Sequence, residues 1–481
     1  MGVRNNQLLI GGEWRDASDG GTFEISNPAT ETVVATAARA TDDDLLAAIE
    51  CADAAFDGWR RTTGWQRSEL LRAAAANIRT ERDEIARLLT IEQGKPLAQS
   101  LAEVDSCVEQ FEWFADEARR IYGRLVDSVV PGVRIQVRRE PVGPVAAFTP
   151  WNFPIMLAAR KLAPALAAGC TIIVKPASEA PSSCLAMVRA IADAGFPSGV
   201  IGVVTGQAGH ISDVLVGDVR IRKVSLTGST AVGTSVIKRA ADTITNVSME
   251  LGGHGPVIVA DDVDVAAVAQ KCVTTKFRNG GQVCVAPTRF YVHESIVDEF
   301  CDAFVEAAGR VVLGDGLDAT TDMGPLASGK RIDEVDGLVR DALDDGATRL
   351  LGGRRSESHT TGHFYLPTIL RDVPETSRVM QEEPFGPIAL INPVADMDEA
   401  VRRANSTEFG LAAYAFTTSL DTAQRLSEEI EAGMVGINSL FVSTAVAPFS
   451  GVKSSGMGAE NGTEAMDAYL TVKTVVTGFE S

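Results

Sequence analysis

"TIIVKPASEAPSSCLAMVRAIADAGFPSGVIGVVTG", residues 171–206, contains two short apolar runs separated by a helical pattern. The runs TIIV and VIGVV have the length of buried strands, and SCLAMVRAIADAGF repeats apolar residues at helical spacing. A strand, a helix and a second strand in one stretch indicate a βαβ unit, whose two strands lie parallel in one sheet. The segment therefore predicts an α/β fold built on a parallel sheet.

The same alternation extends from this segment in both directions. It covers residues 144–253, and a second series begins at GPVIVADD (255–262) and continues to about residue 438. A chain of 481 residues is too long for one hydrophobic core, so we expect two α/β domains that meet near Gly252 and Gly253. Residues 42–122 have helical periodicity throughout.

Two further segments alternate at period two, as exposed strands do. They are VRIQVRRE (133–140) and YLTVKTVVTGF (469–479), and neither has an obvious partner in the chain. Unpaired strand edges invite pairing with another chain. We therefore expect both segments to be edge strands that join a second subunit.

Composition limits the classes of partner. The net charge of −20, from 44 basic and 64 acidic side chains, disfavours binding to nucleic acid or to an anionic membrane surface. No segment is apolar enough for a signal peptide or a membrane span. The seven cysteines are scattered without a Cys-x-x-Cys pair, which is typical of free thiols in a reducing cytoplasm and not of a zinc site. We expect a cytoplasmic protein without a metal.

Open parallel sheets bind ligands beyond the carboxyl ends of their strands, so the residues that follow the apolar runs are the candidates. Lys175 ends one run, and Gly228 opens GSTAVG after another. Backbone N–H groups of GSTAVG could bind a phosphate, although a tight turn alone would also require glycine. Glu250 ends a third run and could act as a general base, or it could be an ion-paired or capping glutamate.

Two other residues are candidates for covalent chemistry. Cys284 lies in FRNGGQVC, where Gly280 and Gly281 indicate a loop close to a ligand, although many free cysteines are small buried hydrophobes. A thiol is a few per cent ionised near neutral pH, so no adjacent histidine is needed to activate it. In FTPWNFP, two prolines flank Asn152, whose amide could stabilise an oxyanion or complete a rigid core turn.

Taken together, six motifs resemble those of the aldehyde dehydrogenase superfamily in order and spacing. They are FTPWNFP (148–154), IIVKPASEAP (172–181), LTGSTAVG (226–233), MELGG (249–253), FRNGGQVC (277–284) and EEPFGP (382–387). The resemblance covers nearly the whole chain and extends to the succinate-semialdehyde dehydrogenases.

The resemblance implies an aldehyde dehydrogenase-like α/β fold with three parts. These are a Rossmann-type cofactor domain (1–120 and 141–252), an α/β catalytic domain (253–452) and a β-strand extension for oligomerisation (121–140 and 453–481). Members of the superfamily join their extensions across subunits, so the resemblance implies a homodimer or a homotetramer.

The resemblance also implies roles for individual residues. Cys284 would be the nucleophile, Asn152 the oxyanion donor and Glu250 the base that activates water for thioester hydrolysis. The expected coenzyme-binding residues are Trp151, Lys175, Ser178, Gly228, Ser229, Glu383 and Phe385.

Coenzyme choice depends on the residue three positions after Lys175. NAD-preferring relatives often have glutamate there, whereas this chain has Ser178, followed by Glu179. A small hydroxyl leaves room for a 2'-phosphate beside the lysine. We expect NADP or NAD as coenzyme, with NADP preferred.

Arg160 and Arg278 correspond to the two arginines that bind the distal carboxylate in succinate-semialdehyde dehydrogenases, and Ser443 corresponds to their assisting serine. The resemblance thus implies oxidation of succinate semialdehyde to succinate. Glutarate semialdehyde and a sulfonated aldehyde are the alternatives within this class. Without the resemblance, each arginine could simply pair with an ordinary aspartate or glutamate.

Three positions depart from the superfamily pattern. Leu226 replaces a common phenylalanine, His254 replaces asparagine or lysine, and Ala286 stands where some relatives have a second cysteine. A redox-switch disulfide is therefore not expected. A rival from another class is a cysteine acyl-transfer hydrolase without a nicotinamide, against which Lys175 and GSTAVG argue.

Overall fold

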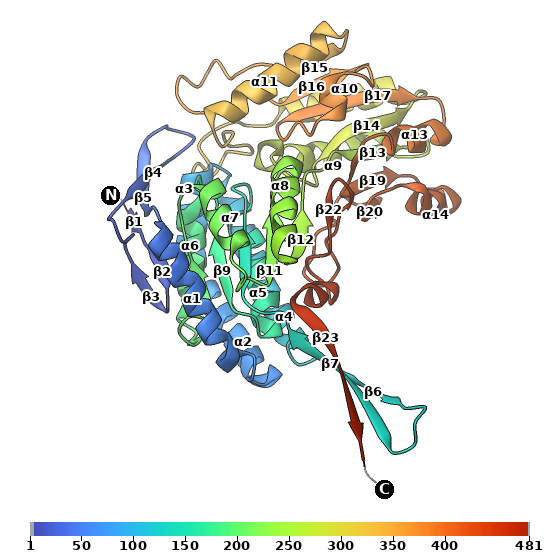
Figure 1. The fold of residues 1–481 in the computed structure, drawn as a ribbon. Helices are drawn as coiled ribbons and strands as arrows, with labels where there is room; N and C mark the ends of the chain where they lie inside the picture. The colour runs from blue at the N-terminus through green and yellow to red at the C-terminus, as the bar shows by residue number, and fades with distance from the viewer. Residues whose placement is uncertain (1–3, 480–481) are drawn as a thin grey trace.

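The structure, a computed structural model, describes residues 4–479 and contains two large β-sheets, each with helices on both faces (Figure 1). Central strands of both sheets run parallel and are buried on both sides. Parallel sheets covered by helices are the arrangement that βαβ units produce. The predicted α/β fold is confirmed.

The first sheet has the strand order β22-β12-β11-β8-β9-β10-β2-β3. The five strands from β12 to β10 are parallel, and the outer strands are antiparallel. The bounds are β2 (Leu8–Ile10), β3 (Glu13–Arg15), β8 (Val145–Phe148), β9 (Ile172–Lys175), β10 (Ile201–Val203), β11 (Lys223–Thr227), β12 (Asn246–Glu250) and β22 (Gly456–Met457).

Eight helices cover this sheet. They are α1 (Asp42–Trp59), α2 (Gly64–Thr80), α3 (Arg82–Gln93), α4 (Leu97–Glu117), α5 (Met156–Ala168), α6 (Pro181–Ala192), α7 (Ala208–Gly217) and α8 (Thr230–Ala240). Successive strand residues point to opposite faces. Val145 and Ala147 of β8 therefore join a core with α2 to α6, whereas Ala146 and Phe148 join a core with α1, α7 and α8.

The second sheet has the order β15-β16-β17-β14-β13-β19-β20, with only β15 antiparallel. Its strands are β13 (Gly255–Val259), β14 (Pro287–His293), β15 (Thr348–Leu351), β16 (Thr368–Arg371), β17 (Ile388–Val394), β19 (Ala412–Phe416) and β20 (Met434–Ile437). The helices around it are α9 (Val265–Lys276), α10 (Val297–Gly309), α11 (Gly329–Asp344), α12 (Arg378–Gln381), α13 (Met397–Ala404) and α14 (Leu420–Glu429).

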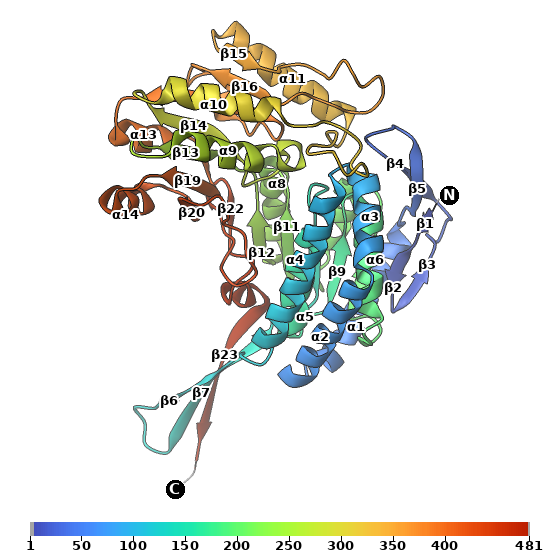
Figure 2. The same ribbon diagram turned by 180° about the vertical axis from the view of Figure 1, so that it is seen from behind.

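The chain passes from the first sheet to the second between Glu250 and Gly255. The view from behind shows the second unit lying across one end of the first (Figure 2). Strand β22 belongs to the first sheet although it falls within the expected oligomerisation segment. Two short pairings complete the fold: β1 (Arg4–Asn6) and β4 (Thr22–Ser26) flank β5 (Val33–Ala38), and β18 (Phe409–Gly410) pairs with β21 (Val452–Lys453).

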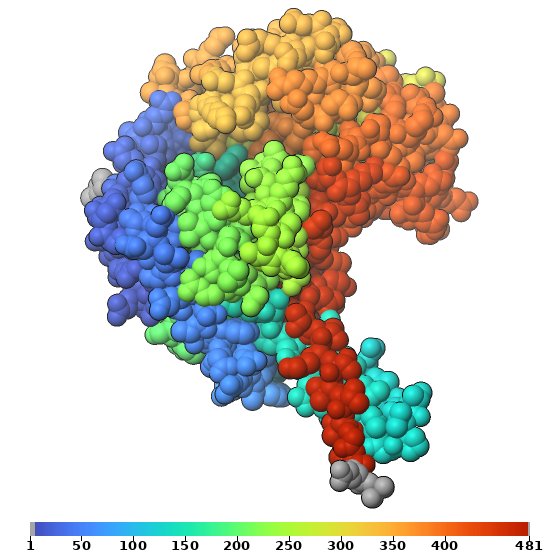
Figure 3. Space-filling model, viewed as in Figure 1, coloured from blue at the N-terminus to red at the C-terminus, as the bar shows by residue number. Residues whose placement is uncertain are grey.

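A three-stranded antiparallel arm projects from the body of the molecule (Figure 3). It consists of β6 (Arg124–Asp127), β7 (Val133–Pro141) and β23 (Leu470–Gly478), in the order β23-β7-β6. The two period-two segments are strands, but the expectation that neither has a partner in the chain is wrong, because β7 and β23 pair with each other. The two strands lie far apart in the sequence, so local patterns could not indicate that they pair. The outer edge of β23 remains open.

No helix within residues 4–479 is long and apolar enough to cross a membrane.

Candidate active site

Four neighbouring strands of the first sheet end in predicted site residues. Glu250 is the last residue of β12, Gly228 follows β11, Asn152 follows β8, and Lys175 ends β9. These strands are adjacent and parallel, so their carboxyl ends meet at one edge of the sheet. This is the edge at which open α/β sheets bind ligands.

The second unit brings Cys284 and Glu383 to this edge. Both precede strands of the second sheet: Cys284 lies in a turn before β14, and Glu383 lies before β17. Gly253 connects them, because its N–H donates to Glu383 Oε1 at 3.0 Å and a Cβ on it would lie 2.4 Å from the Cys284 carbonyl oxygen. The contact is too close for any residue except glycine.

Asn152 is bound directly to the segment that carries the thiol. Its Nδ2 donates to the carbonyl oxygen of Gln282 at 3.1 Å, and the residue is 2 % exposed. A primary amide has two N–H donors, so the second hydrogen of Asn152 is available to a ligand. The structure thus brings the predicted amide donor, which is buried, close to the segment of the predicted nucleophile, which is half-buried.

Burial raises the pKa of Cys284 to about 12, with the charges of Glu383 and Glu250 acting in the same direction and that of Arg160 in the opposite one. Burial therefore opposes the partial ionisation that is expected of a solvated thiol at neutral pH. The tabulated thiol pKa applies to a solvated side chain, whereas this one lies in a recess beside two carboxylates.

Glu250 is 3 % exposed, and neither carboxyl oxygen has a hydrogen-bond partner in the described residues. Burial raises its pKa well above the ordinary value; Glu460 adds to the shift, and the cations of Lys161 and Arg160 oppose it. The capping and ion-pair alternatives are both absent within residues 4–479. A buried carboxyl group with free oxygens can accept a proton from water.

Arg160 and Arg278 lie on segments that adjoin Asn152 and Cys284 in the sequence or in space. Arg160, on α5, is 2 % exposed and donates through Nη2 to the hydroxyl of Ser443. Arg278 is exposed, and its guanidinium lies 5.4 Å from the centre of the Phe153 ring. Limited solvation by the surrounding protein nonetheless lowers the pKa of Arg278.

No Asp or Glu of residues 4–479 forms an ion pair with either arginine, and Arg160 Nε has no partner there. The alternative of ordinary salt bridges is thus not realised in this part of the chain. Two cations without carboxylate partners can bind an anion with charge-assisted hydrogen bonds.

The chain matches the model of the aldehyde dehydrogenase family over residues 14–475. It belongs to the aldehyde dehydrogenase family. The predicted relationship and the predicted fold class are confirmed, and the chain is an NAD(P)-dependent aldehyde oxidoreductase.

Individual relatives match this aldehyde dehydrogenase along nearly their whole length. A glutarate-semialdehyde dehydrogenase of Pseudomonas putida is 43 % identical, covering 97 % of this chain and 96 % of the relative. The NADP+-dependent succinate-semialdehyde dehydrogenase of Escherichia coli is 41 % identical, with 98 % of each chain covered. The crystal structure of a succinate-semialdehyde dehydrogenase from Burkholderia pseudomallei superposes with a TM-score of 0.96 at 40 % identity, covering 98 % of both chains.

Coenzyme in this family is a nicotinamide dinucleotide, and Lys175 and Ser178 provide a suitable place for its adenosine ribose. Lys175 is 4 % exposed, and its Nζ donates to Ser178 Oγ at 3.2 Å. Burial lowers the pKa of Lys175 to about 8, while Glu179 acts in the opposite direction. Among residues 4–479, Ser178 is the hydrogen-bond partner of this buried ammonium group, which can therefore also take an anionic ligand.

The helix α8 begins directly beyond the same edge. Ser229 is its N-cap residue and accepts a hydrogen bond from Val232 N–H at 3.4 Å, and Gly228 precedes it. The free N–H groups of a helix N-terminus and its dipole suit a pyrophosphate. These residues therefore fit the middle of a dinucleotide.

The nicotinamide end would lie near Glu383 and Phe385. Glu383 accepts the Gly253 N–H through Oε1, and its second oxygen has no hydrogen bond within residues 4–479, which suits a ribose hydroxyl. Burial raises the pKa of Glu383 to about 7. Phe385 meets Trp151 edge to face, with ring centres 5.5 Å apart. The strained positive φ of 36° at Phe385 is consistent with a residue held in place for a ligand.

Sequence analysis did not identify three buried charged residues, Lys161, Glu460 and Lys276, whose charges shift the pKa of Glu250 or Glu383. Lys161 donates to Thr227 Oγ1 at 2.7 Å and to Glu460, and both charged groups act on Glu250. Lys276 Nζ is buried without a partner in the described residues and acts on Glu383. For Lys161, the available signal was a charge within the otherwise apolar helical segment that also contains Arg160.

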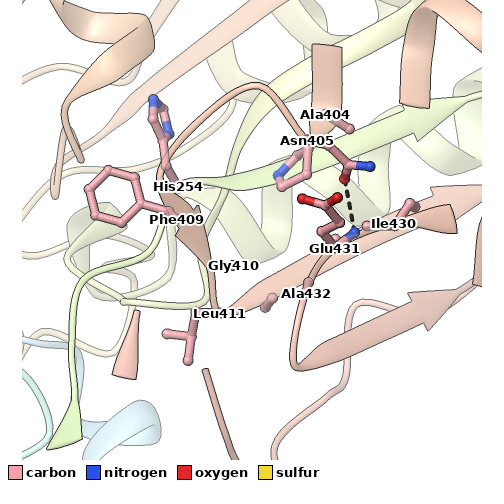
Figure 4. Close-up of a pocket in the computed structure, with 12 residues that line it drawn as sticks. His254, Ala404, Asn405, Phe409, Gly410, Leu411, Ile430, Glu431 and Ala432 are labelled. Atoms are coloured by element: carbon pink, nitrogen blue, oxygen red, sulfur yellow. Dashed lines mark hydrogen bonds between the residues drawn. The ribbon is translucent and has the colours of Figure 1, made fainter. Parts of the chain in front are cut away.

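A separate small cavity lies in the second unit and contains none of the predicted site residues (Figure 4). His254 and Phe409 line one side of it, and the Asn405 side chain accepts a hydrogen bond from Glu431 N–H. His254 is bound on both ring nitrogens, by Thr288 Oγ1 at 2.7 Å and Val379 O at 3.0 Å. Burial holds its pKa well below the ordinary value, so His254 is a neutral structural residue.

Proposed function

We propose that this aldehyde dehydrogenase oxidises a short aldehyde with an anionic tail, with succinate semialdehyde as the substrate and succinate as the product. The observation that carries the proposal is the pair Arg160 and Arg278, neither of which has a carboxylate partner in residues 4–479. Ser443 supports it, because its hydroxyl contacts Arg160. The names of the relatives in Escherichia coli and Burkholderia pseudomallei agree with this substrate class.

In the proposed first step, the Cys284 thiol loses its proton to solvent, and the resulting thiolate attacks the aldehyde. A bond forms between Sγ and the carbonyl carbon, the C=O π electrons move to the oxygen, and the oxygen becomes an alkoxide. Asn152 Nδ2 and the backbone N–H of Cys284 donate to this alkoxide. Removing one such donor costs about 3–4 kcal/mol of transition-state stabilisation in other enzymes.

When bound, an oxidised nicotinamide would supply the acceptor for a hydride from this carbon and a positive charge that favours the Cys284 thiolate. As the hydride leaves, the alkoxide electrons re-form the C=O bond, which gives the thioester on Cys284. The two arginines fix the distal carboxylate, so that the aldehyde carbon stays beside Cys284. Trp151 and Phe385 pack beside the expected nicotinamide position. Lys175, Ser178, Gly228, Ser229 and Glu383 would hold the rest of the coenzyme.

In the second step the thioester on Cys284 is hydrolysed. Glu250 takes a proton from water, the water oxygen bonds to the acyl carbon, and the C–S bond breaks with its electrons returning to sulfur. The free oxygens of Glu250 support this role. The carboxylate product then leaves, and the cysteine is regenerated.

For coenzyme, we propose that NADP+ is preferred over NAD+. Ser178 leaves space next to Lys175, and no glutamate occupies that position to repel a 2'-phosphate. The name of the Escherichia coli relative includes NADP+.

We also propose that the protein assembles into a homodimer or homotetramer through the open edge of β23, and that it resides in the cytoplasm.

A panel of aldehydes tests the proposal. Initial rates of nicotinamide reduction are measured for succinate semialdehyde, glutarate semialdehyde, a sulfonated aldehyde and butanal, each with NADP+ and with NAD+. We expect kcat/KM to be highest for succinate semialdehyde with NADP+ and lowest for butanal, which has no charge. Equal kcat/KM values for butanal and succinate semialdehyde would refute the proposal that Arg160 and Arg278 bind the distal carboxylate.

Glutarate semialdehyde is the second candidate, because the Pseudomonas putida relative has that name. It is one methylene longer than succinate semialdehyde, and one methylene changes binding by only about 1–3 kcal/mol. A higher kcat/KM for glutarate semialdehyde in the same panel would establish it as the better substrate.

A further inference from the structure

A buried ion pair outside the proposed reaction machinery contacts the loop that carries the oxyanion donor. Lys95 follows helix α3, Glu103 lies on α4, and Lys95 Nζ is 2.6 Å from Glu103 Oε2. The side chains of Lys95 and Glu103 are 0 % and 1 % exposed. Burying two charges is costly unless both are fully hydrogen-bonded. The other hydrogen bonds of Lys95 and Glu103 therefore show what the pair supports.

The lysine half of the pair holds the backbone of Asn152. Lys95 Nζ donates to the Asn152 carbonyl oxygen at 2.6 Å. A second donor, Asn279 Nδ2, reaches the same oxygen at 3.0 Å, and Asn279 is held in turn by Gln93 Nε2 at 2.9 Å. The carbonyl of the expected oxyanion donor is therefore fixed from two directions.

The glutamate half holds the start of helix α5. Glu103 Oε1 accepts hydrogen bonds from the N–H groups of Ile155 and Met156, both at 3.2 Å. These are donors at the N-terminus of α5, which has no side-chain cap of its own. Helix α5 carries Arg160, so the same carboxylate fixes the start of the element on which the first arginine lies.

The second arginine is connected through Phe153. Lys95 Nζ lies 4.0 Å from the centre of the Phe153 ring, and the Arg278 guanidinium lies 5.4 Å from the same centre. A ring face attracts a cation. The three proton-bearing directions of the Lys95 ammonium are thus used by Glu103, by Asn152 and by an aromatic ring that also contacts Arg278.

We propose that Lys95 and Glu103 are positioning residues that fix the oxyanion amide of Asn152 and the two substrate arginines relative to one another. The proposal rests on the roles given above to Asn152, Arg160 and Arg278. One ion pair touches the loop, the helix start and the ring that support all three. Displacement of reacting groups by about 1 Å can lower a rate about a hundredfold, so such support matters for the reaction.

The test uses a double variant, Lys95→Met/Glu103→Gln, because removing one partner alone leaves an unpaired buried charge. The amide oxygen of the introduced glutamine can still accept from the start of α5, while the donor to the Asn152 carbonyl is lost. Lys95→Arg is the conservative rescue, since it keeps a cation at the site. The matched control is Arg82→Met/Asp105→Asn, which removes an ion pair joining the same two helices at the surface.

Three quantities are measured on the full-length protein. They are the single-turnover rate of nicotinamide reduction, the Kd of the coenzyme, and hydrogen exchange of the backbone amides of residues 149–156. We expect the double variant to slow the single-turnover rate about 10- to 100-fold. We expect its coenzyme Kd to change much less than the rate, because Lys175, Ser178, Gly228, Ser229 and Glu383 lie on other elements and only Trp151 lies in the loosened loop. Exchange in residues 149–156 should become faster, whereas the control should match the wild type in all three quantities.

Each outcome decides the proposal. An unchanged single-turnover rate, or unchanged exchange in residues 149–156, would overturn it. The proposal would also be overturned if the coenzyme Kd rose by the same factor as the single-turnover rate fell, or if the control variant were as slow as the double variant. Either result would indicate that the whole fold had loosened. Partial recovery of the rate in Lys95→Arg supports it. If the wild type oxidised no aldehyde at all, the proposed function would fail, while the exchange measurement would still decide whether the pair fixes the loop.

Discussion

At the scale of single residues, the site is defined by groups that lack partners. Asn152 Oδ1, Arg160 Nε and both oxygens of Glu250 are buried without a hydrogen bond in residues 4–479. Orphaned buried polar atoms are costly, and in native proteins they mark places completed by water or a ligand. These atoms converge at the edge of the first sheet near Cys284, which agrees with a site built for a polar substrate.

Replacing Arg278 should change substrate selectivity more than turnover. In Arg278→Met, we expect kcat/KM for succinate semialdehyde to fall about 10- to 100-fold, because a hydrogen bond to a charged group contributes about 1.5–3 kcal/mol. The value for butanal should change little. Steady-state rates with both aldehydes measure this difference, and Arg310→Met, at an exposed arginine paired with Glu306, is the control. An unchanged ratio between the two aldehydes would be evidence against the anion-binding role.

The raised pKa of Glu250 predicts a pH dependence. Because burial raises this pKa well above its usual value, the carboxyl group is mostly protonated in acidic solution and becomes a base only as pH rises. The rate of thioester hydrolysis should therefore increase as pH rises through this raised pKa. Pre-steady-state measurement of the step after nicotinamide reduction gives this profile, and the rise should be missing in Glu250→Gln. A rate that declines over the same range would contradict the base assignment.

At the scale of elements, the decisive feature is the meeting of two sheet edges. The carboxyl ends of β12, β11, β8 and β9 face segments that precede β14 and β17. Gly253 lies at the contact, where its missing side chain leaves room for the Cys284 carbonyl. The nucleophile is therefore placed by backbone packing as well as by its own loop.

Gly253→Ala should test this packing. The added methyl group would lie 2.4 Å from the Cys284 carbonyl oxygen, so the turn that carries the thiol must move. We expect kcat to fall at least about tenfold, since small displacements of reacting groups are costly. The control is Gly337→Ala on helix α11, where a Cβ meets nothing within 4 Å and alanine favours the helix. Wild-type kcat in Gly253→Ala would show that the close approach is unimportant.

The loop between β9 and α6 should determine the coenzyme. In Ser178→Glu, a carboxylate would stand beside Lys175 and repel a 2'-phosphate. We expect kcat/KM with NADP+ to fall about tenfold or more while the value with NAD+ is retained or improved. Initial rates with each coenzyme check this, and Glu179→Gln shows the effect of the neighbouring charge. A preference for NAD+ in the wild type would already contradict our expectation.

Much of this element-scale organisation could be predicted from the sequence. The period of the apolar residues gave the helices, the parallel strands and the positions of Lys175, Gly228 and Glu250 at strand ends. Local patterns carry no information about distant contacts, so the pairing of β7 with β23 was missed. The same limit applies to the raised pKa of Cys284 and the buried pair Lys95 and Glu103, which depend on tertiary burial.

At the scale of the whole molecule, the arm formed by β6, β7 and β23 is the surface expected to bind a second subunit. Strand β23 has one edge paired with β7 and the other open, and Val472 and Val476 on it are 68 % and 61 % exposed. Exposed apolar side chains on an open strand edge favour association with another chain. The compact body of the molecule does not cover this arm (Figure 3).

We therefore expect a homo-oligomer that depends on β23. Sedimentation velocity at micromolar concentration should give a dimer or a tetramer for the wild type. Val472→Lys/Val476→Lys should shift the distribution toward the monomer, because two charges would have to be buried in the interface. A lysine pair at exposed positions far from the arm provides the control. A monomeric wild type would contradict the predicted assembly.

The central claim is that the sulfur of Cys284 bonds to the aldehyde carbon before hydride is removed. Rapid mixing of Cys284→Ala with coenzyme and succinate semialdehyde tests it most directly, with coenzyme binding measured on the same sample. The account predicts unchanged coenzyme binding and no formation of reduced nicotinamide. Reduction of the nicotinamide at a substantial fraction of the wild-type rate would contradict it.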